Sequence, residues 1–455
     1  MTSKLARTAA IAVLCALYLY SLGGMGLVTP DEPRYADIGR AMAQTGDWVM
    51  PRLFGVPWFE KPALLYWLVG VGNFSGLDPE WAPRLPIALL SIGFVLLFWY
   101  RVRISWDEAT AWYSTAILAT SAGWLAYSHV AVTDLPLSAC FGAALLLSIP
   151  WVESGDRKLL PYAAAALAFA ALAKGIVPLA LFCPILLFRW RKAFDWLVPA
   201  VVFWVIALPW YVAVSVQSRG EFLRVFFLEH TFGRFQSAAL QHVQPWWFYL
   251  PVLALLVFPW FPFLSILRFR NRKSVTLLAV VVFGFVLFSA SLNKLPGYLL
   301  PLLPALSILL GESFAGSERW KPALLATAAL CGVLPLAGKV LPQALAHGLK
   351  SAEIPWVWIG FVLLGAVMGA LLLLQTKPIA FAGVTVFLAM NLFGLEVFAF
   401  PAIDRAASAR PIWLETHPNC IGKVSRTVFY GLPYYAGHAL PDCAVLDRGA
   451  PRVVR

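Results

Sequence analysis

Acidic, basic and aromatic side chains are concentrated in one stretch that follows the first apolar run of the chain. Residues 29–35 read TPDEPRY, residues 46–48 read GDW, and residues 58–62 read WFEKP. A carboxylate in such a cluster can accept a proton from an attacking hydroxyl group, and neighbouring cations can stabilise a phosphate. The prolines restrict the path of the backbone. This stretch therefore has the content of an active site.

Further ionisable residues stand in short connections between later apolar runs. Asp134 follows Thr133, Lys174 separates two apolar runs, and Lys294 begins the segment KLPGY that ends at Tyr298. Each has a plainer reading: Asp134 as a helix cap, Lys174 as a snorkelling side chain, and Lys294 with Tyr298 as an interfacial anchor. In the functional reading, Lys174 is the partner of a phosphate group.

The amino-acid composition indicates whether these residues belong to a soluble protein or to a membrane protein. Hydrophobic residues make up 60% of the 455 residues and charged residues only 13%, and the mean hydropathy is +0.76. These values predict a polytopic membrane protein. The net charge of +12 comes from short Lys and Arg clusters between apolar runs, where membrane topology explains it without nucleic acid.

The apolar runs predict about thirteen membrane-spanning helices, because a span needs roughly 20 apolar residues. The first candidate runs from about residue 8 to residue 28 and is read as a retained span. The others lie near residues 83–100, 109–129, 135–152, 159–173, 175–189, 194–215, 246–267, 275–292, 298–314, 322–342, 355–375 and 379–398.

Basic clusters fall at every second connection and assign the two faces of this bundle. By the positive-inside rule, the face that carries the basic clusters is cytoplasmic, and so is the N-terminus. An odd number of spans then puts the C-terminus on the other side. We predict one transmembrane domain over residues 1–400, with outer loops at 29–82 and 216–245 and a short outer tail at 401–455. Amphipathic runs at 35–44 and 63–71 predict interfacial helices.

The connections on the outer side bring acids and cations to one face, whereas the cytoplasmic connections are almost only basic. This arrangement suits an anionic head group presented at the outer leaflet. The outer residues that we expect to meet there are Asp31, Glu60, Lys61, Asp134, Lys174, Arg219, His230, Arg234 and Lys294. If the tail is exported, its two cysteines, Cys420 and Cys443, can form a disulfide.

The order of these motifs resembles the aminoarabinose transferase family of GT-C membrane glycosyltransferases, whose relatives include the protein O-mannosyltransferases. The resemblance covers about residues 1–310. It implies an all-α bundle of thirteen spans, interfacial helices in the first outer loop and a small C-terminal cap. The motifs, in order, are DExRY, GDW, FEKP, TDxPL, KG, PWY, EH with RF, PWW and KLPxYxLP.

The resemblance also implies roles for individual residues. Asp31 takes the place of the catalytic carboxylate, and Asp134 matches the second acidic position. Glu60 matches a carboxylate that can hold a divalent metal (zinc, magnesium or manganese) together with His230, or alternatively His242. The metal is optional, because the cations can supply the charge. The residues that the resemblance places around the carrier phosphate are Arg34, Lys61, Lys174, Arg234, Lys294 and Tyr298. The charge on the outer side adds Arg219 to the expected phosphate ligands.

The family transfers a sugar with inversion from an undecaprenyl-phosphate carrier to lipid A or another extracytoplasmic acceptor. The resemblance therefore implies an enzyme of a bacterial inner membrane, with 4-amino-4-deoxy-L-arabinose or a related sugar as the transferred group. A protein O-mannosyltransferase-like activity is an alternative. A flippase or transporter is another, but it needs ionisable residues at mid-membrane and on both faces, which we do not expect here. A receptor subunit has no use for the acid–base cluster.

Overall fold

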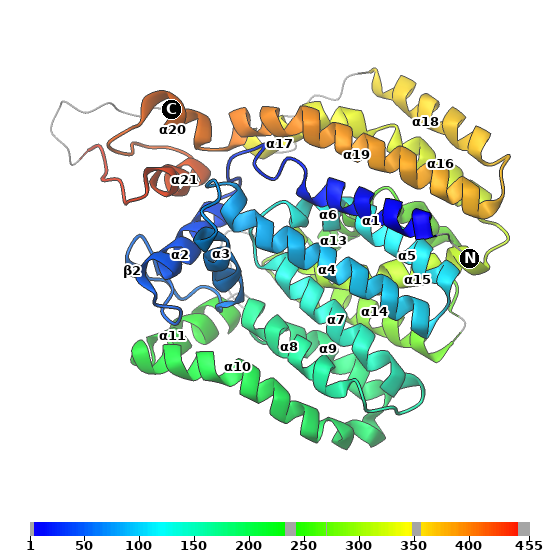
Figure 1. Ribbon diagram of the computed structural model, residues 1–455, viewed down its shortest axis with the longest axis horizontal. Coiled ribbons are helices and arrows are strands. Elements are labelled where there is room, and N and C mark those ends of the chain that lie inside the picture. Colours follow the sequence, from blue (N-terminus) through cyan, green and yellow to red (C-terminus); the bar gives the residue numbers. More distant parts are fainter. Residues whose placement is uncertain (1–3, 233–242, 270, 348–355, 445–455) are drawn as a thin grey trace.

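The computed structural model describes residues 4–232, 243–269, 271–347 and 356–444, and these fold almost entirely into helices (Figure 1). The only strands in the described ranges are β1 (Arg52–Leu53) and β2 (Val56–Pro57), which pair as an antiparallel hairpin. Its two turn residues, Phe54 and Gly55, have φ angles of 51° and 84°, as a type I′ turn requires. The predicted all-α class is confirmed.

The helices follow one another with short connections. The first ten are α1 (Lys4–Leu19), α2 (Asp31–Thr45), α3 (Leu64–Phe74), α4 (Trp81–Ser105), α5 (Glu108–Thr120), α6 (Ala122–Ser128), α7 (Asp134–Glu153), α8 (Leu160–Lys174), α9 (Val177–Phe188) and α10 (Leu197–Gln217). The later ones are α11 (Glu221–Leu223), α13 (Tyr249–Val257), α14 (Arg272–Ala290), α15 (Leu303–Gly316), α16 (Lys321–Cys331), α17 (Leu334–His347), α18 (Trp358–Leu372), α19 (Lys377–Ala407), α20 (Arg410–Thr416) and α21 (Arg426–Ala436).

Several segments next to the α-helices are 3₁₀- or π-helical. The tighter 3₁₀ segments are η1 (Trp190–Trp196), η4 (Trp246–Phe248), η5 (Phe261–Ile266) and η6 (Pro296–Leu302), and η2 (Arg224–Phe232) is a π-helix. Prolines at the starts of η6 and α15 explain why these helices begin where they do, since proline fits the first turn of a helix.

The length and polarity of the helices suit a membrane. In the described ranges, six helices are long and apolar enough to cross a bilayer, and a seventh span results if α16 and α17, bent by 54°, are one broken span. Five further apolar helices are shorter. Each predicted span overlaps at least one helix, but the count of thirteen spans stays a prediction.

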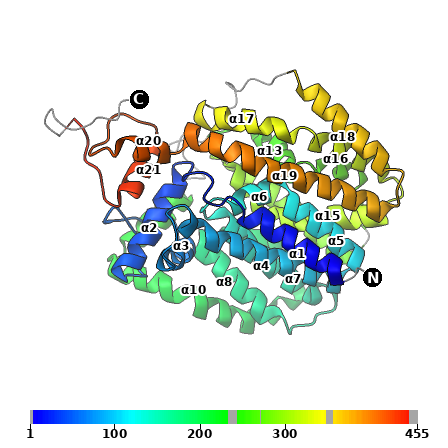
Figure 2. The same ribbon diagram turned by 45° about the horizontal axis from the view of Figure 1, so that its top comes forward.

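The elements of the first predicted outer loop gather at one end of the bundle, which we call the loop end. Figures 1 and 2 both show α2 and α3 there, together with α20 and α21, whereas the N-terminus lies at the opposite end, and Figure 1 also shows β2 beside α2. The predicted helices at 35–44 and 63–71 correspond to α2 and α3.

The sequence of α2 explains its bounds and its packing. Asp31 and Glu32 occupy the first turn, where the helix dipole favours negative charge, and Gly46 ends the helix with a positive φ of 73°. Gly39 lets α3 approach closely, because a β-carbon there would lie 2.4 Å from a methyl group of Val69. The pair α2–α3 thus forms a rigid platform for the motif.

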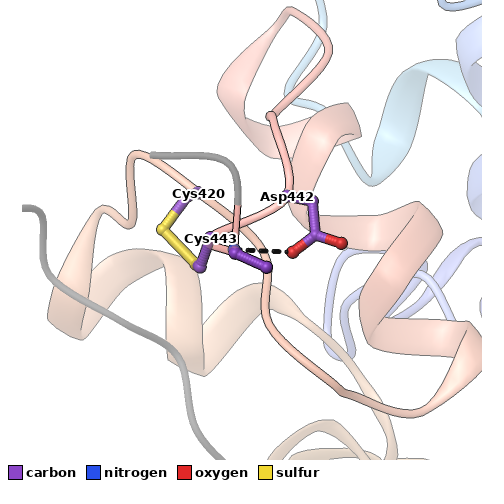
Figure 3. Close-up of a disulfide and its surroundings, with 4 residues drawn as sticks. Cys420, Asp442 and Cys443 are labelled. Atoms are coloured by element: carbon purple, nitrogen blue, oxygen red, sulfur yellow. Dashed lines mark hydrogen bonds between the residues drawn. A yellow bond between two sulfur atoms is a disulfide. The ribbon is translucent and has the colours of Figure 1, made fainter. Parts of the chain in front are cut away.

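The C-terminal cap (residues 408–444) is held to itself and to the bundle. A disulfide joins Cys420 to Cys443, beside a turn in which the Ala444 amide donates to Asp442 over 2.9 Å (Figure 3). The preceding helix, α19, continues to Ala407, beyond the predicted boundary at residue 400.

Candidate active site

A cavity of about 1740 Å³ lies within the bundle and extends to its loop end. Its wall comes from the start of α2, the segment after β2, the α6–α7 connection, the end of α8, η6, and the helices α17, α19 and α21. Seven residues that the sequence singled out line this one cavity: Asp31, Arg34, Glu60, Lys61, Asp134, Lys174 and Tyr298.

Arg34 lies at the centre of the first charged cluster. Its guanidinium group donates to the carboxylate of Asp31, one helical turn earlier, and to Oε2 of Glu60 over 3.0 Å. Burial by itself lowers the pKa of Arg34, but the negative charges of Glu60 and Asp31 outweigh it and raise the pKa above its ordinary value. Arg34 is therefore a fixed positive charge at every working pH.

Glu60 links this arginine to a lysine. Nζ of Lys61 donates to Oε1 of Glu60 over 2.9 Å, so the two carboxylate oxygens of Glu60 each contact a different cation. Both Glu60 and Lys61 are buried. The side chain of Asp31, by contrast, is 43% exposed. Asp31 is thus the carboxylate of this cluster that an incoming molecule can reach most easily.

Asp134 and Lys174 form a second charged pair in the same wall. Asp134 begins α7, Lys174 ends α8, and Nζ of Lys174 donates to Oδ1 of Asp134 over 2.7 Å. The ammonium group also lies 4.7 Å from the centre of the Tyr298 ring, within cation–π range. Gly297 makes room for this pair, because a β-carbon there would lie 2.5 Å from Oδ1 of Asp134.

Two of the predicted phosphate ligands lie elsewhere. Lys294 is buried, and its ammonium group donates to the backbone carbonyls of Gln244 and Ser291, so it ties two connections together. It does not line the cavity. Arg219 is exposed at the turn after α10 with a φ of 53° and does not line the cavity either. The interpretation of both as phosphate ligands is not supported by their positions.

The remaining predicted residues cannot be placed. Arg234 and His242 lie outside the described residues, and the side chain of His230, within η2, is not described. Among the described residues, no group of three or more His, Cys, Asp or Glu side chains is arranged to hold a metal ion. Glu60 itself is surrounded by cations, which is a poor environment for a metal ligand.

A fully buried ion pair behind the motif went unpredicted. Arg84, in α4, contacts both carboxylate oxygens of Glu32 over 2.7 and 2.8 Å, and neither side chain is exposed. The other Glu32 contacts are the backbone amides of Val28 and Ala131, at 2.7 and 3.0 Å. Glu32 therefore joins the first loop to the α6–α7 connection.

Arg84 extends this anchor to the chain before α2. Its guanidinium group donates to the backbone carbonyls of Leu22, Met25 and Gly26 over 2.6–2.9 Å. The segment that carries Asp31 is consequently held from both sides. A lone arginine at the start of an apolar run is the sequence feature that points to such a role, because a charge at that depth needs a partner.

The C-terminal cap completes the mouth of the cavity. The ring of Tyr430, in α21, lies 5.1 Å from the guanidinium carbon of Arg34. Tyr430 and Arg426 both line the cavity. Tyr434 fixes the position of α21, since its hydroxyl group donates to the Pro79 carbonyl over 2.7 Å.

One expectation about the interior is wrong. We expected no ionisable residues at mid-membrane, yet Glu396 lies within the apolar helix α19, is buried and lines the cavity. Nε2 of His129, at the end of α6, lies 3.6 Å from Oε1 of Glu396. A single acid inside a long apolar run is easily overlooked, although such a residue usually marks a function.

The sequence and the fold both match known membrane proteins. The sequence profile of the dolichyl-phosphate-mannose-protein mannosyltransferase family matches residues 4–276. The undecaprenyl phosphate-alpha-4-amino-4-deoxy-L-arabinose arabinosyl transferase of Pseudomonas paraeruginosa is 33% identical over an alignment of 315 residues that covers 65% of this chain. The match spans only 57% of the length of that relative.

Solved structures extend the likeness to almost the whole chain. ArnT from Cupriavidus metallidurans bound to undecaprenyl phosphate superimposes with a TM-score of 0.77 and 27% identity, over 96% of this chain and 86% of that one. The apo state of the same protein gives a TM-score of 0.76 and 26% identity over the same shares. The chain is accordingly a multi-pass membrane protein of the dolichyl-phosphate-mannose-protein mannosyltransferase family, with the aminoarabinose transferase-like form of the GT-C fold.

Proposed function

We propose that the protein is an inverting glycosyltransferase that moves a sugar from an undecaprenyl-phosphate carrier to a lipid acceptor. One observation carries the proposal: Asp31 faces the same cavity as the cations Arg34, Lys61 and Lys174. Glycosyl transfer from a phosphate carrier needs this combination, because a negative charge develops on the leaving phosphate while an acceptor oxygen attacks.

Cations bind the leaving group in the proposed reaction. The bond between C1 of the sugar and the phosphate oxygen breaks, and its electron pair stays on the phosphate. Lys61 and Lys174 stabilise that charge, with Arg34 beside them. Each of these cations already contacts a carboxylate. The carboxylates hold the cations in place before the carrier arrives, so little rearrangement is needed when the phosphate joins them.

Asp31 acts on the acceptor. If the acceptor is a hydroxyl group, Asp31 accepts its proton as the oxygen attacks C1 from the face opposite the phosphate. If the acceptor is a phosphate, it is already ionised, and Asp31 orients it. We propose 4-amino-4-deoxy-L-arabinose as the sugar, because the P. paraeruginosa relative is named for an arabinosyl transfer from this carrier. We propose lipid A as the acceptor, because the motif resemblance implies it.

The proposed location is the bacterial inner membrane, with the N-terminus cytoplasmic and the cavity mouth periplasmic. The disulfide in the C-terminal cap supports this orientation, since disulfides persist in the periplasm but not in the cytosol. A divalent metal on Glu60 and His230 remains an optional part of the proposal. No step is assigned to it, because Arg34 and Lys61 already surround Glu60 with positive charge.

The decisive variant is Asp31→Asn, which keeps the shape of the side chain and removes its charge. We expect transfer to fall by about 10²–10⁴-fold, while the melting temperature changes little, because Asp31 is partly exposed. The assay uses purified protein, radiolabelled undecaprenyl-phosphate sugar, and either lipid A or a Ser/Thr peptide as acceptor, with and without a chelator.

Asp78→Asn is the matched control, since Asp78 is an exposed carboxylate between α3 and α4. Turnover by Asp31→Asn close to that of the Asp78 variant would refute the assignment of Asp31. Transfer to the peptide instead of lipid A would replace the proposed acceptor by a protein. Movement of intact carrier without release of undecaprenyl phosphate would mark a flippase.

A further inference from the structure

A second polar site lies in the cavity wall, where α19 meets the end of α6. Glu396 projects from α19 and His129 from the end of α6, and both side chains are only 3% exposed. Both residues line the cavity. Apolar residues line the same cavity, among them Val130, Leu392 and Phe400, and the Phe400 ring lies 5.6 Å from the His129 ring.

The hydrogen bonds of this site are incomplete. Within the described residues, neither carboxylate oxygen of Glu396 has a hydrogen-bond partner. Nε2 of His129 lies 3.6 Å from Oε1 of Glu396, which is longer than a hydrogen bond. Nδ1 of His129 is 3.0 Å from the Leu125 carbonyl, so this nitrogen carries a proton and Nε2 faces the acid.

A buried carboxylic acid without partners is costly unless a ligand satisfies it. The group that fits is a hydrogen-bond donor, because Glu396 lines the cavity and neither of its side-chain oxygens has a partner within the described residues. The apolar surroundings require that the donor be carried by a molecule that is otherwise largely hydrocarbon.

We propose that Glu396, assisted by His129, binds a hydroxyl or amino group on an amphiphilic lipid that occupies the apolar part of the cavity. The cavity volume of about 1740 Å³ exceeds the roughly 300–1000 Å³ of a usual small-molecule pocket, which leaves space for a second lipid beside the carrier. The identification of this lipid as the acceptor rests on the proposed function.

The two sites are close enough to serve one reaction. His129 precedes Asp134 by five residues, and five extended residues span at most about 18 Å. Asp134 belongs to the carrier site through its ion pair with Lys174. A lipid whose donor group is held at Glu396 therefore reaches the reacting centre with a head group of ordinary size.

Photolabelling of the full-length protein in lipid nanodiscs tests the inference. Three long-chain probes carry the same diazirine and differ only at one end: an alcohol, an amine and the methyl ether of the alcohol. We expect the alcohol and the amine to label peptides of α17 and α19 about tenfold more than the ether does, as one hydrogen bond to a charged or buried acceptor provides. Equal labelling by all three probes in the wild-type protein would overturn the inference.

Variants locate the effect at the carboxylate. Glu396→Leu abolishes the preference for the donor probes, whereas Glu396→Gln retains part of it, since the amide oxygen still accepts. Phe398→Leu is the control, because Phe398 lies on the same helix and is 79% exposed. A preference that survives in Glu396→Leu contradicts the assignment.

Carrier binding separates this inference from the proposed function. Glu396→Leu keeps its affinity for undecaprenyl phosphate, whereas Lys61→Met and Lys174→Met lose it and keep the probe preference. If Lys61→Met and Lys174→Met bind undecaprenyl phosphate as tightly as the wild type, the proposed carrier site is wrong. The result at Glu396 does not depend on that outcome. If Glu396→Leu does not fold, the comparison of the three probes on wild-type protein still tests the inference.

Discussion

Two neighbouring acids, Asp31 and Glu32, occupy opposite environments in the first turn of α2. The Glu32 side chain is fully buried in an ion pair with Arg84, whereas the Asp31 side chain is 43% exposed and lines the cavity. Consecutive residues point about 100° apart around a helix, so one acid can anchor the turn while the next one faces a ligand. Within the motif, Glu32 therefore holds the site in place, and Asp31 is available for the chemistry.

The same contrast holds for the cations. Arg84 makes all its described contacts with the protein interior, whereas Lys174 contacts Asp134 at a wall that a ligand can reach. Removing a partner from the buried pair should damage the fold, and removing one from the cavity pair should damage function. The predictions below test that division.

The largest effect is expected for Arg84→Met. The substitution leaves Glu32 buried without its cation and leaves three carbonyls without a donor, which should destabilise the protein by about 3–5 kcal/mol. The double variant Glu32→Leu/Arg84→Met should recover part of the loss, because no unpaired charge remains. Thermal unfolding in detergent measures both; a loss below 1 kcal/mol in the single variant would show that the pair is not an anchor.

Lys174→Met should show the reverse pattern. Transfer should fall on the order of 100-fold, because a cation that stabilises the leaving phosphate is lost. Stability should change much less than in Arg84→Met, since both side chains of the pair are partly exposed, at 13% and 16%. Lys174→Arg should retain part of the activity. Undiminished transfer by the methionine variant would remove Lys174 from the carrier site.

Hydropathy predicted most of the fold, because lipid forces the backbone to satisfy its own hydrogen bonds in helices. The helices α2 and α3 were also predictable from their amphipathic pattern. The hairpin β1–β2 was not expected, although its turn sequence, Phe54-Gly55, includes the residue type that such turns prefer.

The candidate site was predictable as a set of residues but not as a set of contacts. Lys174 and Lys294 are both single lysines in short connections, and the sequence treats them alike. One contacts a cavity carboxylate and the other binds backbone carbonyls. Their difference depends on where distant backbone segments converge, as does the pairing of Glu32 with Arg84 across 52 positions.

The smallest effect is expected at the point where the C-terminal cap meets the catalytic motif. Tyr430→Leu removes the ring that lies against Arg34, a cation–π contact worth about 0.5–1 kcal/mol. KM for the carrier should therefore rise about two- to fivefold, with kcat nearly unchanged, because Arg34 keeps both of its carboxylate partners. Tyr430→Phe should behave as the wild type, since it keeps the ring, and Phe429→Leu, at a neighbouring exposed ring, is the control. If the phenylalanine variant is as impaired as the leucine variant, the hydroxyl group is what matters, and the cap takes part in binding through a hydrogen bond instead of the ring.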